Sequence, residues 1–119
     1  MPRPARLPSE VEITQAESEL GVVFHADFRS YLREASDVVF GTREPVTLTI
    51  PDSHTDLRLV AHHAWDAGVP WDWTPICEDN GDFYCVRPNG SIAFWAHDGA
   101  SDETWPSLAQ WIEEEWIQQ

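Results

Sequence analysis

Histidine and acidic side chains are the residues of this chain whose types could hold a metal ion. His62 and His63 are adjacent in an expected helix, where consecutive side chains point about 100° apart, so the two rings cannot both face one ion. Neither H-E-x-x-H nor H-x-x-E-H surrounds them, and these spacings are the ones that bring two helical histidines onto zinc. Asp56, Asp66 or His97 could join them only if folding brought distant segments together. The pattern therefore predicts no metal site.

The acidic run Glu78-Asp79-Asn80-Gly81-Asp82 has the composition of a calcium loop but not its spacing. It lacks the D-x-[DN]-x-[DN]-G pattern and the closing glutamate of an EF-hand, so we interpret it as a solvated turn. The chain also has no G-x-S-x-G, no P-loop, no G-x-G-x-x-G and no cysteine in a recognisable nucleophile motif. We therefore predict no catalytic residues and no cofactor, and a protein that is not an enzyme.

Two tryptophans before this acidic run could instead bind another protein. Trp71 and Trp73 alternate with an aspartate between two prolines, where a loop would present them, although burial under a sheet edge is the alternative. An exposed tryptophan near Glu78, Asp79 and Asp82 would form an aromatic anchor ringed by carboxylates, which suits a basic protein partner. These five residues are the predicted partner-binding site.

The charge balance narrows the class of partner. Twenty-one acidic residues face seven arginines and no lysine, which gives a formal net charge of −14. A field of this sign repels nucleic acids and anionic membranes and attracts basic proteins, so we expect no direct nucleic-acid or membrane binding. Solubility alone would also account for the acids, because net charge away from zero keeps proteins apart.

Length and cysteine usage indicate one globular domain. A chain of 119 residues buries roughly two-thirds of its unfolded surface, which is enough for a core without disulfides. Cys77 and Cys85 lack C-x-x-C spacing and are expected to be buried thiols. No apolar run approaches the ~20 residues that span a bilayer, and the start of the chain lacks the apolar segment of a secretory signal, which favours the cytoplasm. Residues 1–8 are expected to be flexible, and residues 9–119 to form the domain.

Capping residues and apolar periodicity predict four helices. Ser9 and Glu12 form a capping box for the first helix, and Gly21 ends it. Ser53 is the expected N-cap of the third helix, and Gly68 its end. The second and fourth helices are indicated by apolar residues at helical spacing, which are Phe28, Tyr31, Leu32 and Ala35 in one and Leu108, Trp111, Ile112 and Trp116 in the other.

Aromatic residues on both sides of Asn89-Gly90 predict the central hairpin of an antiparallel sheet. The Asn-Gly pair suits a two-residue type I′ turn, which places Cys85 opposite Phe94 and Tyr84 opposite Trp95. Both faces of this hairpin are apolar, so it belongs in the middle of the sheet. Residues 45–51 alternate apolar and hydroxyl side chains and predict a half-buried strand near an edge, and residues 73–77 enter the sheet ahead of the hairpin.

The order of these features resembles the SUKH superfamily. ITQAESELG at residues 13–21 and DFRSYL at residues 27–32 resemble its opening pattern, I-x-x-x-E-x-x-L-G…D-[YF]-x-x-[FY]-L. The proline at residue 75, NGDFYC at residues 80–85 and NGSIAFW at residues 89–95 resemble its later strands and turns, and the matches span residues 13–111 in family order. Phe24-His25 departs from the Leu-Pro that the family places before its second helix.

The resemblance implies a single α+β domain in which helices pack against an antiparallel sheet with a central hairpin. Bacterial members of the superfamily are mostly immunity proteins that neutralise a toxin of their own strain, commonly a nuclease, whereas fungal members regulate cell-wall assembly and signalling. We therefore predict a bacterial immunity protein that binds a cognate toxin domain with a basic surface. A regulatory adaptor of the same fold is the alternative, and a small metal-dependent hydrolase is a more distant third. The toxin's identity, the binding face and the oligomeric state stay open.

Overall fold

The computed structural model describes residues 6–38, 43–98 and 103–117, and it confirms the α+β class. The chain forms helices α1 (Glu10–Leu20), α2 (Ala26–Glu34), α3 (Leu57–Ala67) and α4 (Leu108–Trp111), strands β1 (Thr74–Asp79), β2 (Asp82–Val86), β3 (Ile92–Trp95) and β4 (Thr104–Trp105), and a π-helix η1 (Ile112–Ile117). Residues 1–5 of the segment expected to be flexible lie outside the described residues, and Arg6 pairs with Glu12.

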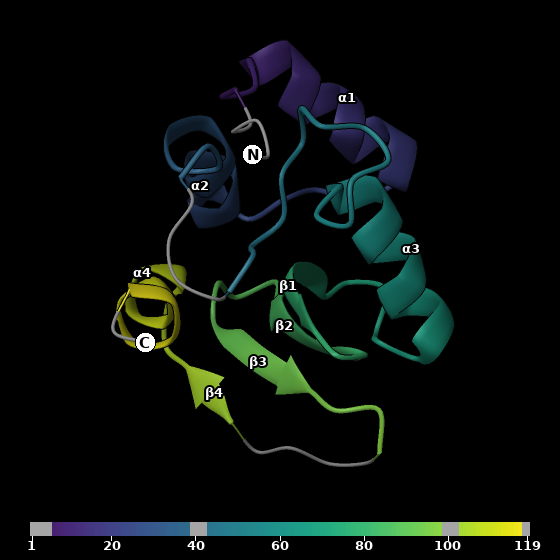
Figure 1. Ribbon diagram of the computed structural model, residues 1–119, viewed down its shortest axis with the longest axis vertical. Helices are drawn as coiled ribbons and strands as arrows, with labels where there is room; N and C mark the ends of the chain where they lie inside the picture. The colour runs from purple at the N-terminus through teal and green to yellow at the C-terminus, as the bar shows by residue number, and fades with distance from the viewer. Residues whose placement is uncertain (1–5, 39–42, 99–102, 118–119) are drawn as a thin grey trace.

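The four strands form one antiparallel sheet in the order β1-β2-β3-β4. In Figure 1, α1 and α2 lie above the sheet, α3 lies to its right and α4 to its left. Strand β2 has neighbours on both sides, and its residues Phe83, Tyr84, Cys85 and Val86 are all buried. Strands β2 and β3 are the two central strands, so the expectation that their hairpin lies in the middle of the sheet is confirmed.

The aromatic residues on the two faces of the sheet form separate clusters. On one face the Tyr84 ring lies between those of Phe94, Trp105 and Trp111, at centroid distances of 4.7, 5.6 and 5.3 Å. On the other face, Phe83 packs against Trp95 at 6.1 Å. Such aromatic pairs add to the stability that burial of their apolar area already provides. Aromatic side chains therefore pack on both faces of the sheet.

The predicted register of the hairpin between β2 and β3 is wrong by one residue. Tyr84 pairs with Phe94, and Phe83 pairs with Trp95, because the loop contains three residues rather than two. Arg87 accepts a hydrogen bond from the Gly90 N–H at 2.9 Å, and only Gly90 within the loop has a positive φ, of 89°. This is a type I turn followed by a glycine in the left-handed region, and proline at residue 88 suits its second position.

The two-residue turn with two positive φ values occurs instead between β1 and β2. Asn80 and Gly81 have φ angles of 53° and 90°, as a type I′ turn requires, and Asp79 pairs with Asp82 across it. The acidic run that we interpreted as a solvated turn is therefore the tip of a tight hairpin. This turn fixes where the carboxylates at its base lie.

The predicted helix ends are confirmed at three of four positions. The capping box between Ser9 and Glu12 is present, and Gly21 and Gly68 end α1 and α3 with positive φ angles of 71° and 120°. The expected cap at Ser53 is wrong, because Asp56 is the N-cap of α3. The Ser53 hydroxyl accepts the N–H of Thr55 within a local turn, so the helix begins after it.

The predicted strand over residues 45–51 is also wrong. Only one bridge forms there, between Thr47 and Asp56, and the backbone of the segment bonds to several different elements. The Val46 N–H donates to Ile76 at 2.7 Å, the Thr47 N–H donates to Thr55 at 2.8 Å, and the Tyr31 hydroxyl donates to the Val46 carbonyl. Residues 45–48 are all buried, so the alternation of apolar and hydroxyl residues does not correspond to one buried and one exposed face.

The C-terminal helix exists, but it changes type along its length. It begins at Leu108 with Ser107 as its N-cap, and it continues as a π-helix from Ile112 to Ile117. Trp111 and Trp116 are both buried. Residues five apart diverge on an α-helix, whereas the i to i+5 hydrogen bonds of a π-helix place them on one side. The change in helix type therefore lets both indole rings enter the core.

Candidate partner-binding surface

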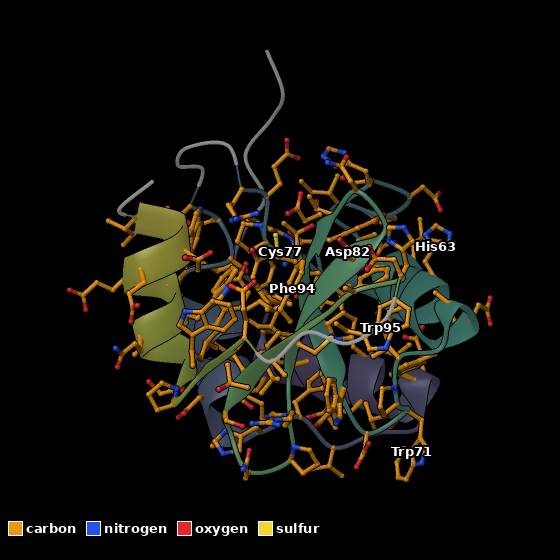
Figure 2. The ribbon with its side chains drawn as sticks, turned by 90° about the horizontal axis from the view of Figure 1, so that it is seen from below. His63, Trp71, Cys77, Asp82, Phe94 and Trp95 are labelled. Carbon is orange, nitrogen blue, oxygen red and sulfur yellow. The ribbon has the colours of Figure 1, made fainter. Side chains whose placement is uncertain are left out.

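The structure separates the five predicted partner-binding residues into two groups. Trp71 and Trp73 precede β1, whereas Glu78 and Asp79 end it and Asp82 begins β2. At about 3.3 Å per residue, the length of β1 places roughly 16 Å between the groups. Figure 2 shows Trp71 at the lower edge of the molecule and Asp82 nearer its centre, well apart in that view. The expectation of a tryptophan ringed by these carboxylates is therefore wrong.

The two tryptophans of the first group have different environments. A turn in which the Trp73 N–H donates to the Pro70 carbonyl at 2.9 Å presents Trp71, whose side chain is 72% exposed. Trp73 is half-buried, with the guanidinium of Arg87 5.7 Å from its ring centroid, and its carbonyl accepts the Trp65 indole N–H at 3.2 Å. Trp71 is therefore the tryptophan that a partner can reach, and Trp73 supports the loop.

Trp71 lines a cavity of about 750 Å³, which we call the Trp71 groove. One wall is the connection between α1 and α2, and the other consists of the loop before β1 and the loop after β2. Its main lining residues are Val22, Val23, Phe24, Trp71, Asp72, Arg87 and Pro88. Val23 is 90% exposed, so two large apolar side chains open to solvent meet at this groove.

Sequence reasoning missed this groove. The sequence signal for the groove is the apolar run Val22-Val23-Phe24 directly after the helix stop at Gly21. Three consecutive apolar residues in an extended connection cannot all point to the same side, so one of them is expected to face solvent. The departure from the family's Leu-Pro also lies here. The His25 ring nitrogen Nδ1 accepts the Asp27 N–H at 3.1 Å, so His25 caps α2 in place of a proline entry.

The second group, Glu78, Asp79 and Asp82, forms what we call the acidic hairpin. Asp79 pairs with Arg43 at 3.2 Å, and the Asp82 carboxylate accepts the His97 N–H at 2.9 Å and contacts its Nδ1 at 2.5 Å. These hydrogen bonds from His97 lower the pKa of Asp82, and the hydrogen bond to Asp82 raises the pKa of His97. Glu78 is exposed, and within the described residues it has no ion pair. Glu78 is thus the carboxylate of this hairpin that a partner can engage.

The arginines are largely occupied by contacts inside the protein. Among the residues that the structure describes, Arg6 pairs with Glu12, Arg29 with Glu10 and Glu17, Arg33 with Glu10, Arg43 with Asp79 and Glu115, and Arg58 with Glu19. Arg87 lies over the ring of Trp73. Exposed ion pairs add little stability, but each of the first five arginines lies beside an acid of the same chain.

The remaining acids dominate the outer surface. Within residues 6–38, 43–98 and 103–117, the exposed carboxylates without an ion pair include Glu34, Asp52, Asp66, Asp72, Glu78, Asp98 and Glu114. Since the net charge is −14 and five of the arginines that the structure describes are paired with acids, acids are in excess on the surface that a partner meets. The chemistry of this surface suits a basic partner.

The residues considered for a metal site do not converge. His62 and His63 are both exposed on α3, and Asp56 accepts the Arg58 N–H as the cap of that helix. In the part of the chain that the structure describes, no group of three or more His, Cys, Asp or Glu residues could hold a metal ion.

The two cysteines are buried and unpaired, as predicted. Burial raises the pKa of Cys77 to about 11, and burial likewise raises the pKa of Cys85 well above its ordinary value. A thiol in such surroundings stays protonated at neutral pH and reacts slowly.

Over the described residues, no helix has the length and apolar character needed to cross a bilayer.

Comparison with known proteins identifies the family. The model of the SUKH_5 family, described as SMI1-KNR4 cell-wall, matches residues 1–117. A solved structure, titled "Crystal structure of protein from Pseudomonas syringae pv. tomato", is similar with a TM-score of 0.95 and 39% sequence identity, over 100% of this chain and 89% of that chain. No curated protein matches the chain. The family match over nearly the whole sequence confirms the resemblance drawn from the motifs, and the chain belongs to the SMI1-KNR4 family of the SUKH superfamily.

Proposed function

We propose that this protein is a bacterial immunity protein that binds and neutralises a cognate toxin domain with a basic surface, a nuclease, in the cytoplasm. The family supports, at its own level, a toxin-immunity role or a role like that of the SMI1-KNR4 proteins. The observation that carries the choice of a basic partner is that five of the described arginines form ion pairs with acids of this same chain, which leaves the excess of acids facing solvent.

Charge complementarity is the reason for proposing a nuclease as the partner. A nuclease needs a basic surface to hold the phosphate backbone of its substrate. An acidic protein that covers this surface competes with the nucleic acid directly. Opposite fields also raise the association rate, so that a toxin is captured soon after it appears.

The proposed contact residues are Trp71, Trp73, Glu78, Asp79 and Asp82, with distinct roles. Trp71 is the exposed aromatic anchor, and Trp73 supports the loop that presents it. Glu78 attracts the toxin, whereas Asp79 and Asp82 hold the hairpin in place through Arg43 and His97. The protein acts by binding and not by catalysis.

Binding kinetics with the toxin domain encoded by the adjacent gene would test this proposal. The variant Glu78→Lys removes the free carboxylate of the acidic hairpin and leaves the ion pair of Asp79 intact. Because exposed charges act mainly on encounter, we expect its association rate to fall by about 2- to 10-fold and its dissociation rate to change little. Raising the salt concentration should reduce the difference, since screening acts over about 10 Å at 0.1 M.

The matched control is Glu34→Lys, which makes the same charge change at an exposed carboxylate on α2. A general effect of net charge would slow both variants equally, and this result would remove the acidic hairpin from the proposal. Failure of the unmodified protein to bind the toxin domain or to inhibit it would overturn the immunity function and favour the regulatory adaptor.

A further inference from the structure

We propose that the Trp71 groove is the site that holds the toxin once it has been captured, and that it receives an apolar side chain next to an arginine on the toxin's basic surface. This inference rests on the proposed function. It adds a second contact, roughly 16 Å from the acidic hairpin, with a different kinetic role.

The apolar part of the groove favours an apolar side chain. Val23 and Trp71 are the most exposed large apolar side chains of the described residues, at 90% and 72%, and both line the same cavity. Covering them removes apolar area from water, which gains about 25 cal/mol per Å². Large aromatic residues in central pockets are also the side chains that most often dominate binding energy.

The charged part of the groove favours an arginine beside that apolar side chain. Asp72 lines the cavity next to Trp71 and has no ion pair within the described residues. The cation of the groove, Arg87, lies over Trp73 and donates from Nε to the Ser91 hydroxyl at 2.8 Å. A guanidinium can stack on an indole face and bond a carboxylate at the same time, so Trp71 and Asp72 together suit an incoming arginine.

The net charge argues against a second copy of this chain as the occupant. Two copies that met at this groove would each carry a charge of −14, and like charges of this size repel. A basic partner meets the opposite field. The negative charge of this protein therefore favours the basic toxin over a second copy of this chain as the occupant of the Trp71 groove.

The walls of the groove are fixed, so the site exists before the partner binds. Glu17 Oε2 accepts the Phe24 N–H at 2.7 Å, and the Glu17 carboxylate also pairs with Arg29, which holds the connection after α1. The opposite wall is fixed by the turn that ends at Trp73. A preformed site avoids the cost of ordering a loop on binding, so more of the contact energy lengthens the lifetime of the complex.

The test measures dissociation of the toxin domain encoded by the adjacent gene from Trp71→Ala and from Val23→Ser. Both side chains are exposed, so the fold should survive, and thermal unfolding checks this. We expect the dissociation rate to rise about 30-fold or more for Trp71→Ala, the size of a binding hot spot, while the association rate changes less than threefold. Asp72→Asn should raise the dissociation rate as well.

The matched control for Val23→Ser is Val11→Ser. Val11 is 66% exposed on α1 and does not line the groove, and serine and valine have similar helix propensity. Only the change at Val23 should speed dissociation. Equal rates for the two serine variants, or an unchanged dissociation rate for Trp71→Ala, would overturn the groove proposal while the immunity function stands.

The remaining outcomes are also decisive. If the unmodified protein does not bind the toxin domain, the proposed function fails and the groove proposal fails with it. If the free protein forms a dimer in sedimentation experiments and Trp71→Ala abolishes that dimer, the groove belongs to a second copy and the proposal is overturned.

Discussion

Gly90 is the residue whose substitution most directly tests the observed turn between β2 and β3. Its φ is +89°, and a Cβ atom built on it would lie 2.6 Å from Nε2 of His25 and 2.8 Å from Cε1 of that ring. Real Cβ atoms do not approach other atoms this closely, so Gly90→Ala must move the ring or the loop. The ring resists because its Nδ1 accepts the Asp27 N–H and caps α2.

Two costs combine in this variant. A non-glycine residue in the left-handed region costs about 1–2 kcal/mol. Displacing the His25 ring removes the N-cap of α2, and the loss of such a cap costs about 0.5–2 kcal/mol. The free energy of unfolding should therefore fall by about 2–4 kcal/mol. With a urea dependence of about 2 kcal/mol per M, the middle of the usual range, the unfolding midpoint should fall by about 1–2 M.

Equilibrium urea unfolding of four variants separates the two costs. Gly21→Ala is the matched control, because Gly21 also has a positive φ, of 71°, but a Cβ there would meet nothing within 4 Å. It should lose only the backbone cost. In a His25→Ala background, Gly90→Ala should cost as little as Gly21→Ala does. A Gly90→Ala variant that is no less stable than Gly21→Ala, or whose cost is unchanged without His25, would refute the close contact.

Two further predictions concern titratable groups. Asp82→Asn should return the pKa of His97 toward its ordinary value near 6.5, because the Asp82 carboxylate raises it, and NMR titration would follow this change. In the unmodified protein, the contact between His97 and Asp82 stabilises the fold below pH 6.5. This contribution is lost as the pH rises through the raised pKa of His97. Identical His97 titrations in both proteins would contradict the contact. Cys77 and Cys85 should not react with a thiol reagent at neutral pH in the native protein and should both react in denaturant, because burial raises both pKa values. Rapid labelling of either native thiol would show that it is accessible.

Local signals allowed the helix ends to be predicted from the sequence. The capping box of α1 and the stops at Gly21 and Gly68 depend mainly on residues within one helical turn, so they can be predicted without knowing distant contacts. Ser53 failed as a cap for an equally local reason. Ser53 and Asp56 both suit a cap, and the choice depended on the turn that Thr55 closes.

The strand register depended on a proline beside the turn, and the predicted edge strand depended on contacts that the sequence does not state. Asn89-Gly90 and Asn80-Gly81 are the same dipeptide, yet only the second forms the two-residue turn. The proline at residue 88 moved the first into a longer loop, which changed the face that Trp95 occupies. Likewise, the alternating residues 45–51 could not form a strand, because their backbone bonds go to three separate segments.

The candidate site shows the same limit in a form that matters for function. Trp71 and Trp73 lie in similar sequence surroundings, yet Trp73 packs against the core with Arg87 over its ring, whereas Trp71 is exposed. The carboxylates were predicted beside the tryptophans because they are near in sequence. The rise per residue of an extended strand is larger than that of a helix, so residues close in sequence lie far apart along it. A helix over the same residues would have kept them within about 8 Å.

This separation changes how a partner can be recognised. A standard interface covers about 800 Å² on each protein, which corresponds to a patch roughly 30 Å across. Under the proposed function, a patch of this width is wide enough to include both Glu78 and Trp71, although the two lie beyond or at opposite ends of β1. The acidic hairpin has free charge but no exposed aromatic side chain, and the Trp71 groove has exposed apolar area but little free charge. Charge at a distance acts on the association rate, and apolar contact acts on the lifetime of a complex, so the proposal assigns capture of the partner to one end of β1 and its retention to the other.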